Sequence, residues 1–258
     1  MRKVLLLGIG LLFVCDAALA DGQRPQGYLD AASMPDTTVI LPQAPVKGTA
    51  RYDADRKIFL RTRKLKGSAR WQMAVNDNDY STPAVAKDFS CALGVTIDPG
   101  EESHLATLIS RIGIDLSHAD RDAKNFNRRL RPFLIDKGET CVPITPEFAK
   151  SYDYPSGHAT YSWGLGLVLA EIAPDRATQI LARARAYGES RVVCGVHNAS
   201  AVDAGRTEAS IVIAALHSSA EFRADVEAAR SELAAARAKA VPPAGCETEN
   251  ALVAQPLY

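Results

Sequence analysis

The chain has 258 residues, enough for one large domain or two small ones. Its 30 basic residues balance its 30 acidic residues, so bulk charge gives no attraction to nucleic acid or to an anionic membrane surface. After the N-terminal region no apolar run reaches the roughly 18 residues of a membrane-spanning helix, so no membrane contact is expected.

The first twenty residues have the three parts of an export signal. Arg2 and Lys3 precede an apolar run, and Ala18-Leu19-Ala20 has the small residues that signal peptidases cleave after. We therefore expect residues 1–20 to be a signal peptide cleaved near Ala20, and the mature protein to be periplasmic or secreted, with a net charge of about −1. Cys15 raises a lipoprotein alternative, but the residue before it is large where a small one would be expected.

The remaining chain is predicted to be all-α. Residues 21–50 are rich in Pro, Gly and Thr and predict an extended arm, within which residues 38–41 come nearest to the alternation of a strand. Over residues 51–240, apolar residues recur at spacings of three and four, which is typical of helices in a compact bundle. Residues 241–258 are predicted to be an irregular tail. Gly and Pro positions separate nine expected helices: 53–64, 69–79, 81–92, 101–118, 119–135, 159–172, 174–190, 199–216 and 219–239.

Four cysteines lie beyond the signal: Cys91, Cys141, Cys194 and Cys246. An even number of cysteines in an exported chain favours disulfides. Four cysteines allow three pairings, and the sequence does not choose among them. None has the C-x-x-C spacing of a metal or redox site, so no bound metal is expected.

The first of three segments with chemical potential runs from Lys124 to Pro132 and reads K-N-F-N-R-R-L-R-P. Lys124 and Arg131 are seven residues apart, almost two helical turns, so on a helix they project from one face. Arg128 lies on nearly the same face. Taken alone, this segment is typical of a solvated basic helix face.

The second segment is Tyr154-Pro155-Ser156-Gly157-His158, directly before an apolar helix. A glycine turn at a helix start exposes backbone N–H groups at the positive end of the helix dipole, which is a site for an anion. Ser156 adds a hydroxyl donor, and His158 adds an acid or base that titrates near neutrality. The alternative is an ordinary capping turn before a core helix.

The third segment ends in Ser190-Arg191-Val192-Val193-Cys194-Gly195-Val196-His197. Arg191 has the planar guanidinium that binds oxyanions through two bonds. A single histidine such as His197 is more often a satisfied core residue than a reactive one. The three segments together favour phosphoryl transfer, which needs cations around the phosphate oxygens, a nucleophile and an acid for the leaving group.

The order and spacing of these segments resemble a known family. Lys-x6-Arg-Pro, Pro-Ser-Gly-His and Ser-Arg-x5-His form the signature of the phosphatidic acid phosphatase type 2 superfamily, which includes the vanadium haloperoxidases. The wording Y-P-S-G-H and G-E-S-R-V-V-C-G is most similar to bacterial class A non-specific acid phosphatases. The similarity extends from about Phe89 to Phe222 and implies the compact helical bundle of that superfamily.

The resemblance also implies roles for individual residues. His197 would attack phosphorus and form a phosphohistidine, and His158 would protonate the leaving alcohol and later activate water. The phosphate oxygens would be bound by the remaining residues of the signature, namely Lys124, Arg131, Ser156, Gly157 and Arg191. Asp153 and Tyr154 are expected at the pocket rim. The resemblance suggests Cys141–Cys194 as one disulfide, which leaves Cys91–Cys246 as the other.

The implied partners are small phosphate-ester substrates. No cofactor is expected, although phosphate, vanadate and similar oxyanions should bind as ligands or inhibitors. No nucleic acid or membrane partner is expected after signal removal, and a homo-oligomer is left open.

The sequence departs from the family pattern at one position. The family has an aspartate four residues after the nucleophile, where it fixes the imidazole tautomer by the logic of a catalytic triad. Here that position is Ala201, and Asp203, two residues further, would face away from His197 and pair locally with Arg206. Either a remote residue or a carbonyl replaces the aspartate, or activity is reduced, or the protein only binds phosphate. A vanadium haloperoxidase is a second alternative.

Overall fold

The computed structural model describes residues 26–97, 103–239, 241 and 243–258, so the expected signal peptide lies outside the described residues. Within those ranges the chain forms helices and no β-strand, which confirms the all-α class. None of these helices is long and apolar enough to cross a membrane. The α-helices are α1 (Thr37–Ile40), α2 (Ala50–Thr62), α3 (Ala69–Asn76), α4 (Thr82–Asp88), α5 (Ser90–Leu93), α6 (His104–Asn127), α7 (Pro146–Lys150), α8 (Gly157–Ile172), α9 (Ala177–Val193), α10 (Ala199–Leu216), α11 (Ala220–Lys239) and α12 (Cys246–Val253), and the 3-10 turns are η1 (Arg63–Leu65), η2 (Pro132–Leu134) and η3 (Pro174–Arg176).

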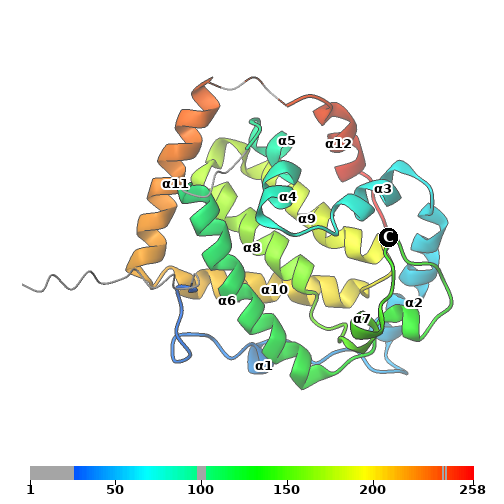
Figure 1. The fold of residues 1–258 in the computed structure, drawn as a ribbon. Helices are drawn as coiled ribbons and strands as arrows, with labels where there is room; N and C mark the ends of the chain where they lie inside the picture. The colour runs from blue at the N-terminus through cyan, green and yellow to red at the C-terminus, as the bar shows by residue number, and fades with distance from the viewer. Residues whose placement is uncertain (1–25, 98–102, 240, 242) are drawn as a thin grey trace, which may run out of the picture.

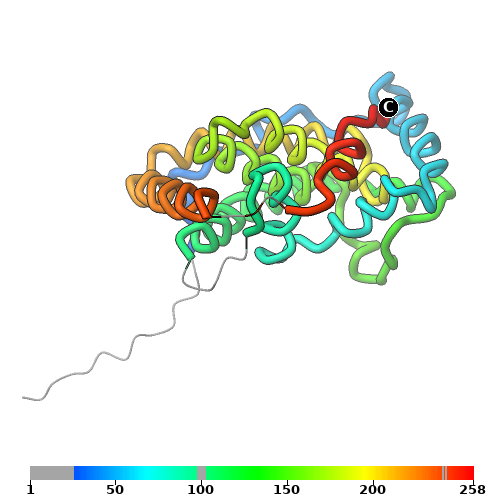
Figure 2. Tube along the Cα trace, turned by 90° about the horizontal axis from the view of Figure 1, so that it is seen from above, coloured from blue at the N-terminus to red at the C-terminus, as the bar shows by residue number. Residues whose placement is uncertain are grey.

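Helix α8 is the centre of the fold, and α6, α9, α10 and α11 pack around it (Figure 1). Leu165, Val168 and Leu169 on this helix are each at most 2% exposed, as expected for a helix that is apolar on almost every face. Seen from above, α11 lies at one end of the bundle and α2 and α3 lie at the other (Figure 2).

The start of α8 lies unusually close to α10. A Cβ atom added at Gly205 of α10 would lie 2.7 Å from the carbonyl oxygen of Ser156 and 3.0 Å from the backbone nitrogen of Thr160. Only a glycine at this position allows the two backbones to approach so closely. The second motif segment therefore packs directly against α10, the helix that follows the third segment.

Helix α6 differs from the prediction, which divided the same stretch into helices 101–118 and 119–135. No Gly or Pro interrupts residues 114–127, so one helix continues to Asn127. It ends there because Arg128 adopts a left-handed conformation with φ of 48°, and its N–H donates to the carbonyl oxygen of Lys124 at 2.9 Å. Residues 129–131 are therefore not helical, only the short 3-10 turn η2 directly follows them, and the prediction of a continuing α-helix was wrong.

Three short helices were missed by the sequence prediction. Helix α1 occupies residues that came nearest to strand alternation, and α7 begins at Pro146 with Thr145 as its N-cap. Helix α12 lies in the tail that was expected to be irregular. The tail is ordered by packing, because Val253 contacts Met73 of α3 and Ala186 of α9.

Two disulfides join distant parts of the chain. Cys91–Cys246 connects α5 to α12, and Cys141–Cys194 connects the loop before α7 to the end of α9. Both expected pairings are confirmed. The second bond fixes a loop that contributes to the cavity described below.

The described part of the N-terminal arm lies along the helical domain. The backbone N–H groups of Tyr28 and Leu29 donate to the Asp115 carboxylate of α6 at 2.7 and 3.2 Å. Further along, the carbonyl oxygen of Pro42 accepts a hydrogen bond from the Tyr154 hydroxyl at 2.7 Å. The arm is thereby attached to α6 and to the segment that precedes α8.

Candidate active site

The bundle brings the three motif segments to one cavity of about 800 Å³. It opens where the C-terminal ends of α6 and α9 meet the N-terminal ends of α8 and α10. Six of the seven residues predicted to be catalytic or phosphate-binding line it, and Ser156, which is fully buried, lies next to it. The six are Lys124, Arg131, Gly157, His158, Arg191 and His197.

Three cations and the first turn of α8 form what we call the cage. Lys124 comes from the last turn of α6, Arg131 from the extended segment after it, and Arg191 from the last turn of α9. Both arginines are at least 96% buried, and their guanidinium groups bond to neutral oxygen and nitrogen atoms. Burial, and for Arg191 also the charge of Arg131, lowers the pKa of each to about 10. Both stay charged at neutral pH, so an anion would offset this positive charge.

Arg131 reaches the cavity by a route that the sequence did not predict. Lys124 and Arg131 were placed on one helix face with Arg128 between them, but the helix ends at Asn127. Arg128 is exposed, and Arg129 is the neighbour that turns inward. Helix periodicity therefore gave the wrong reason for bringing Lys124 and Arg131 together.

An acidic residue, Asp120, also lines the cavity. Its carboxylate pairs with Lys124 one turn later on α6, and Lys124 also donates to the carbonyl oxygen of Pro155. A Cβ atom on Gly157 would lie 2.8 Å from Asp120 Oδ2, so the glycine allows the carboxylate to approach the first turn of α8. Sequence reasoning missed Asp120, although its four-residue spacing from Lys124 is the usual signal for such a pair.

The start of α8 provides donors to the cavity. Ser156 is its N-cap, and the Ser156 N–H donates to the carbonyl oxygen of Ala201 at 3.0 Å. The first N–H groups of a helix have no intrahelical acceptor and carry the positive end of its dipole. Ser156 Oγ is buried and has no hydrogen-bond partner among the described residues. An unpaired buried hydroxyl costs about 1–3 kcal/mol, so a bound anion that accepted its hydrogen bond would remove a penalty.

His158 lies at the cavity wall, two residues after the N-cap Ser156. Its Nε2 is 3.1 Å from the carbonyl oxygen of Asn78, which can only accept, so Nε2 carries the proton. The ring packs edge-on against Tyr80 with centroids 4.7 Å apart. Burial, followed by the charge of Arg191, lowers the pKa of His158 well below its ordinary value.

His197 has a defined tautomer. Its Nδ1 is 2.7 Å from the carbonyl oxygen of Asp153 and 3.2 Å from Asp153 Oδ1, and both atoms are acceptors. Its Nε2 is 3.0 Å from a guanidinium nitrogen of Arg131, which can only donate. Burial and the charges of Arg131, Lys124 and Arg191 lower the pKa of His197 well below its ordinary value. The ring is therefore neutral with its Nε2 lone pair at the cage, the form that a nucleophile needs.

The structure does not place Asp153 and Tyr154 at the pocket rim, where the sequence analysis expected them. Asp153 is 0% exposed and lies behind His197, and Tyr154 is 2% exposed with its hydroxyl on the N-terminal arm. Both residues precede the Pro-Ser-Gly-His turn, but the chain there runs beneath the cavity.

Behind His197 lies a second charged group, which we call the supporting network: Asp153, Arg129 and Asp55. Arg129 lies 2.7 Å from Asp55 Oδ2 and 3.5 Å from Asp153 Oδ2. Asn198 completes the contacts of Asp153, because its backbone N–H donates to Oδ1 at 3.0 Å and its side chain donates to Oδ2 at 2.8 Å. Asp203, in contrast, is 44% exposed and pairs with Arg206 at 2.6 Å, as predicted.

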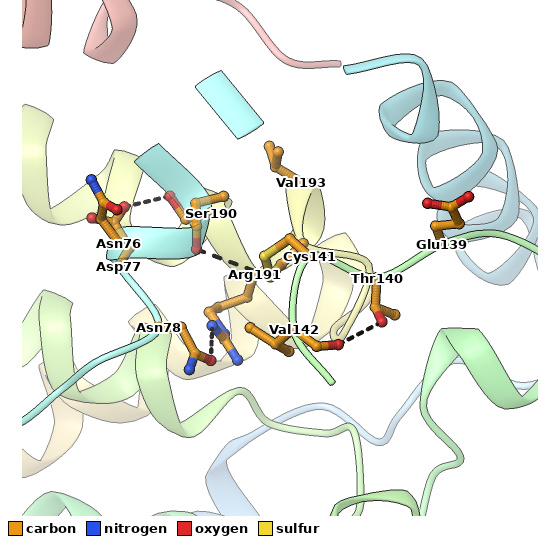
Figure 3. Close-up of a disulfide and its surroundings, with 12 residues drawn as sticks. Asn76, Asp77, Asn78, Glu139, Thr140, Cys141, Val142, Ser190, Arg191 and Val193 are labelled. Carbon is orange, nitrogen blue, oxygen red and sulfur yellow. Dashed lines mark hydrogen bonds between the residues drawn. A yellow bond between two sulfur atoms is a disulfide. The ribbon is translucent and has the colours of Figure 1, made fainter. Parts of the chain in front are cut away.

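The outer wall of the cavity was not predicted from the sequence. Figure 3 shows Asn78, from the loop after α3, in a hydrogen bond of 3.0 Å with Arg191. It also shows Val142, a lining residue, directly after disulfide-bonded Cys141. Tyr80 and Tyr161 add aromatic surface. These residues carry no motif, and only the fold brings them to the site.

Among the residues that the structure describes, no group of three or more His, Cys, Asp or Glu side chains could hold a metal ion. The charged groups of the cavity are instead the cations of the cage and Asp120. The arrangement can bind an oxyanion, present a neutral imidazole to it and supply a second imidazole for proton transfer.

Comparisons with known proteins agree with this arrangement. The sequence model of the PAP2 superfamily matches residues 104–224. An acid phosphatase from Zymomonas mobilis subsp. mobilis is 38% identical over 90% of this chain and 93% of the relative. Non-specific acid phosphatases from Providencia stuartii and Salmonella typhimurium are 34% and 33% identical, over 80% and 75% of this chain and 84% and 78% of the relatives.

The chain therefore belongs to the PAP2 superfamily, among its non-specific acid phosphatases, and is a phosphatase enzyme. A solved transmembrane PAP2 type phosphatidylglycerolphosphate phosphatase from Bacillus subtilis gives a TM-score of 0.49 at 15% identity, covering 70% of this chain and 89% of that one.

Proposed function

We propose that the protein hydrolyses small phosphate monoesters through a phosphohistidine on His197. The observation that carries the proposal is the tautomer of His197: Nδ1–H donates to Asp153, and the Nε2 lone pair faces the cage beside Arg131. The cations, Ser156 Oγ and the Gly157 N–H would bind the phosphate oxygens. Such preorganised donors stabilise charge that develops on the oxygens in the transition state.

In the first step Nε2 of His197 attacks phosphorus, and the ester bond to the leaving oxygen breaks. That oxygen takes the electron pair and receives a proton from His158. Burial and nearby cations lower the pKa of His158, and a bound phosphate would raise it by offsetting those charges. In the second step water attacks the phosphohistidine, His158 takes a proton from the water, and the N–P electron pair returns to Nε2.

The cage supports a metal-independent reaction, because two arginines and a lysine supply the positive charge that metal ions supply in other phosphoryl-transfer enzymes. The two disulfides support export, since such bonds persist in oxidising compartments such as the periplasm. N-terminal sequencing of the protein from cells tests export, and a mature chain beginning near Asp21 is the expected result.

The apolar wall supports broad specificity. Beyond the cage the cavity is lined by Tyr80, Tyr161 and Ile109, which offer contact area rather than a fixed set of hydrogen bonds. A leaving group would therefore be held by its apolar surface, and many alcohols would fit.

The direct test is release of p-nitrophenol from its phosphate ester at pH 5–7, with and without a chelator. We expect activity that the chelator does not change and that His197→Ala lowers by at least about 10³-fold. His217→Ala is a matched control, because His217 is exposed and pairs with Glu171 away from the cavity. Chelator-sensitive activity, or none, would contradict the proposal.

Neither alternative gains support from the structure. A protein that only binds phosphate was suggested because Ala201 replaces the orienting aspartate, but His197 Nδ1 has acceptors on Asp153. The haloperoxidase alternative has no support in the comparisons, because the relatives that match over most of the chain are acid phosphatases.

A further inference from the structure

We propose that Asp153 is the positioning residue of His197, and that its carboxylate replaces the one that position 201 lacks. The inference rests on the proposed function, in which His197 is the nucleophile. In this chain the acid comes from the segment before α8, whereas in the family pattern it comes from the helix after the nucleophile.

The contacts of His197 identify the acid. Asp153 is fully buried, and its Oδ1 lies 3.2 Å from Nδ1 of His197, the ring nitrogen on the side away from the cage. Its carbonyl oxygen accepts from the same nitrogen at 2.7 Å. One residue therefore places a dipole and a charge on the same N–H group.

The neighbours of the Asp153 carboxylate favour its ionised form. Oδ1 accepts from the Asn198 N–H, and Oδ2 accepts from the Asn198 side chain, with Arg129 3.5 Å away. Burial raises the pKa of Asp153, and these donors together with the Arg129 cation act against that shift. Arg129 is in turn fixed by Asp55 at 2.7 Å.

Position 201 has a different use in this chain. Ala201 is 0% exposed and packs against Tyr154 and Ala204, and its carbonyl oxygen accepts from the Ser156 N–H. Its backbone thus fixes the N-cap of α8, while its side chain is too small to reach His197. Asp153 thus supplies to Nδ1 the carboxylate that an aspartate at position 201 would supply in the family pattern.

The charge has a defined task in the reaction. When Nε2 bonds to phosphorus while Nδ1 keeps its proton, the imidazole ring becomes positively charged. A carbonyl oxygen fixes the tautomer but has no full charge with which to stabilise that cation, whereas the Asp153 carboxylate has one. The carboxylate should therefore matter for turnover more than for phosphate binding.

The experiment separates the effect of the Asp153 carboxylate from the effect of its backbone carbonyl oxygen. Asp153→Asn keeps the backbone and the size of the side chain but removes the charge. We expect kcat to fall by about 10-fold or more, since loss of a group that orients a functional histidine costs from about 10-fold to about 10⁴-fold, while the inhibition constant of inorganic phosphate changes less than about threefold. Asp203→Asn is the matched control, since this exposed carboxylate pairs with Arg206, and its kcat should equal that of the wild type.

Exchange of the two side chains gives a second readout. Asp153→Ala should lower kcat at least as much as Asp153→Asn, and the double variant Asp153→Ala/Ala201→Asp should recover about tenfold or more of that loss. A merely structural role for Asp153 would not be rescued from position 201. Melting temperatures of all variants identify any that fail to fold.

Two results would overturn the inference. A kcat of Asp153→Asn within twofold of the wild type would mean that the carbonyl oxygen alone is sufficient. An equal loss of phosphate binding and kcat, with no recovery in the double variant, would mean that Asp153 only maintains the structure. Both outcomes require an active wild-type enzyme, so they differ from failure of the proposed function, in which the wild type itself has no activity.

Discussion

The charges on the two sides of His197 are arranged in opposite ways. In the cage, Arg131 and Arg191 are buried and bond to neutral atoms, and only Lys124 has an acidic partner in Asp120. In the supporting network, Arg129 lies between Asp55 and Asp153, and the network has more acid than base. The charges of the cage thus favour binding of an anion, and the charges of the supporting network favour a positive charge on the His197 ring. Replacing arginines on the two sides should therefore have different effects on activity and stability.

The largest effect on activity is expected on the cage side. Arg191→Met should lower kcat/KM for p-nitrophenyl phosphate by about 10³-fold, because a donor aimed at the phosphate oxygens is lost. The same change should raise the free energy of unfolding by about 1 kcal/mol, since burial and Arg131 already disfavour the charge of Arg191. Denaturant unfolding and steady-state kinetics measure the two effects, with Arg206→Met as control. A lower free energy of unfolding for Arg191→Met would contradict the proposed difference between the two sides of His197.

The largest effect on stability is expected on the other side. Arg129→Met leaves the buried carboxylates of Asp55 and Asp153 without their cation, which should lower the free energy of unfolding by about 3–5 kcal/mol. Exposed Arg128 next to it is the control, and Arg128→Met should change stability by less than about 0.5 kcal/mol. Unfolding in urea with the disulfides intact makes the comparison. Similar values for the two variants would mean that the supporting network does not stabilise the fold.

Another buried acid, Glu208 of α10, makes the stability of the fold depend on pH. It is fully buried, accepts from the Thr160 and Thr37 hydroxyls, and burial together with the charge of Asp120 raises its pKa to about 8. The folded state then keeps a proton that the unfolded state has lost, so stability falls as pH rises from about 4.5 to about 8. This group alone should make the wild type about 3 kcal/mol more stable at pH 5 than at pH 8.

Glu208→Gln should reduce this pH dependence, measured by unfolding at pH 5 and pH 8. It should not abolish it, because burial also raises the pKa of Asp88 to about 7 and acts in the same direction. An unchanged slope would mean that Glu208 is ionised in the folded protein, and that the acidic groups near the cage do not favour the fold at low pH.

The smallest effect is expected for Asp120, the acid inside the cage. Asp120→Asn removes a negative charge that pairs with Lys124, and should tighten inhibition by inorganic phosphate by about three- to tenfold. Asp122→Asn on the exposed face of α6 is the control. Weaker inhibition by phosphate in Asp120→Asn would show that Asp120 holds Lys124 in position rather than competing with the anion.

The sequence predicted the cage better than its surroundings, for a physical reason. Lys124, Gly157 and Arg191 each lie in a short continuous motif at the end of one helix. The local sequence pattern was therefore enough to identify them. Asn78 and Tyr80 reach the cavity only through the packing of α3 and the loop after it, and no local signal marks them. The helices of the core were predicted because their apolar periodicity is local.

The errors of the sequence prediction also have specific physical causes. The end of α6 depends on the left-handed conformation of Arg128, a residue type that gives no warning of it. Helix α12 is ordered by contacts with α3 and α9 and by the bond to Cys91, which are long-range. Asp153 was placed at the rim because its position before the turn was known but its direction was not. The missing aspartate at position 201 was visible in the sequence, whereas its replacement required the fold.

The most direct measurement is the site of phosphorylation during turnover. The enzyme is mixed with p-nitrophenyl phosphate, quenched within milliseconds in alkali, digested and analysed by mass spectrometry. We expect phosphate on the peptide that carries His197, at its Nε2, and a smaller amount of phosphoenzyme in Asp153→Asn. Phosphate on His158, or an active enzyme from which no phosphohistidine is trapped, would contradict it.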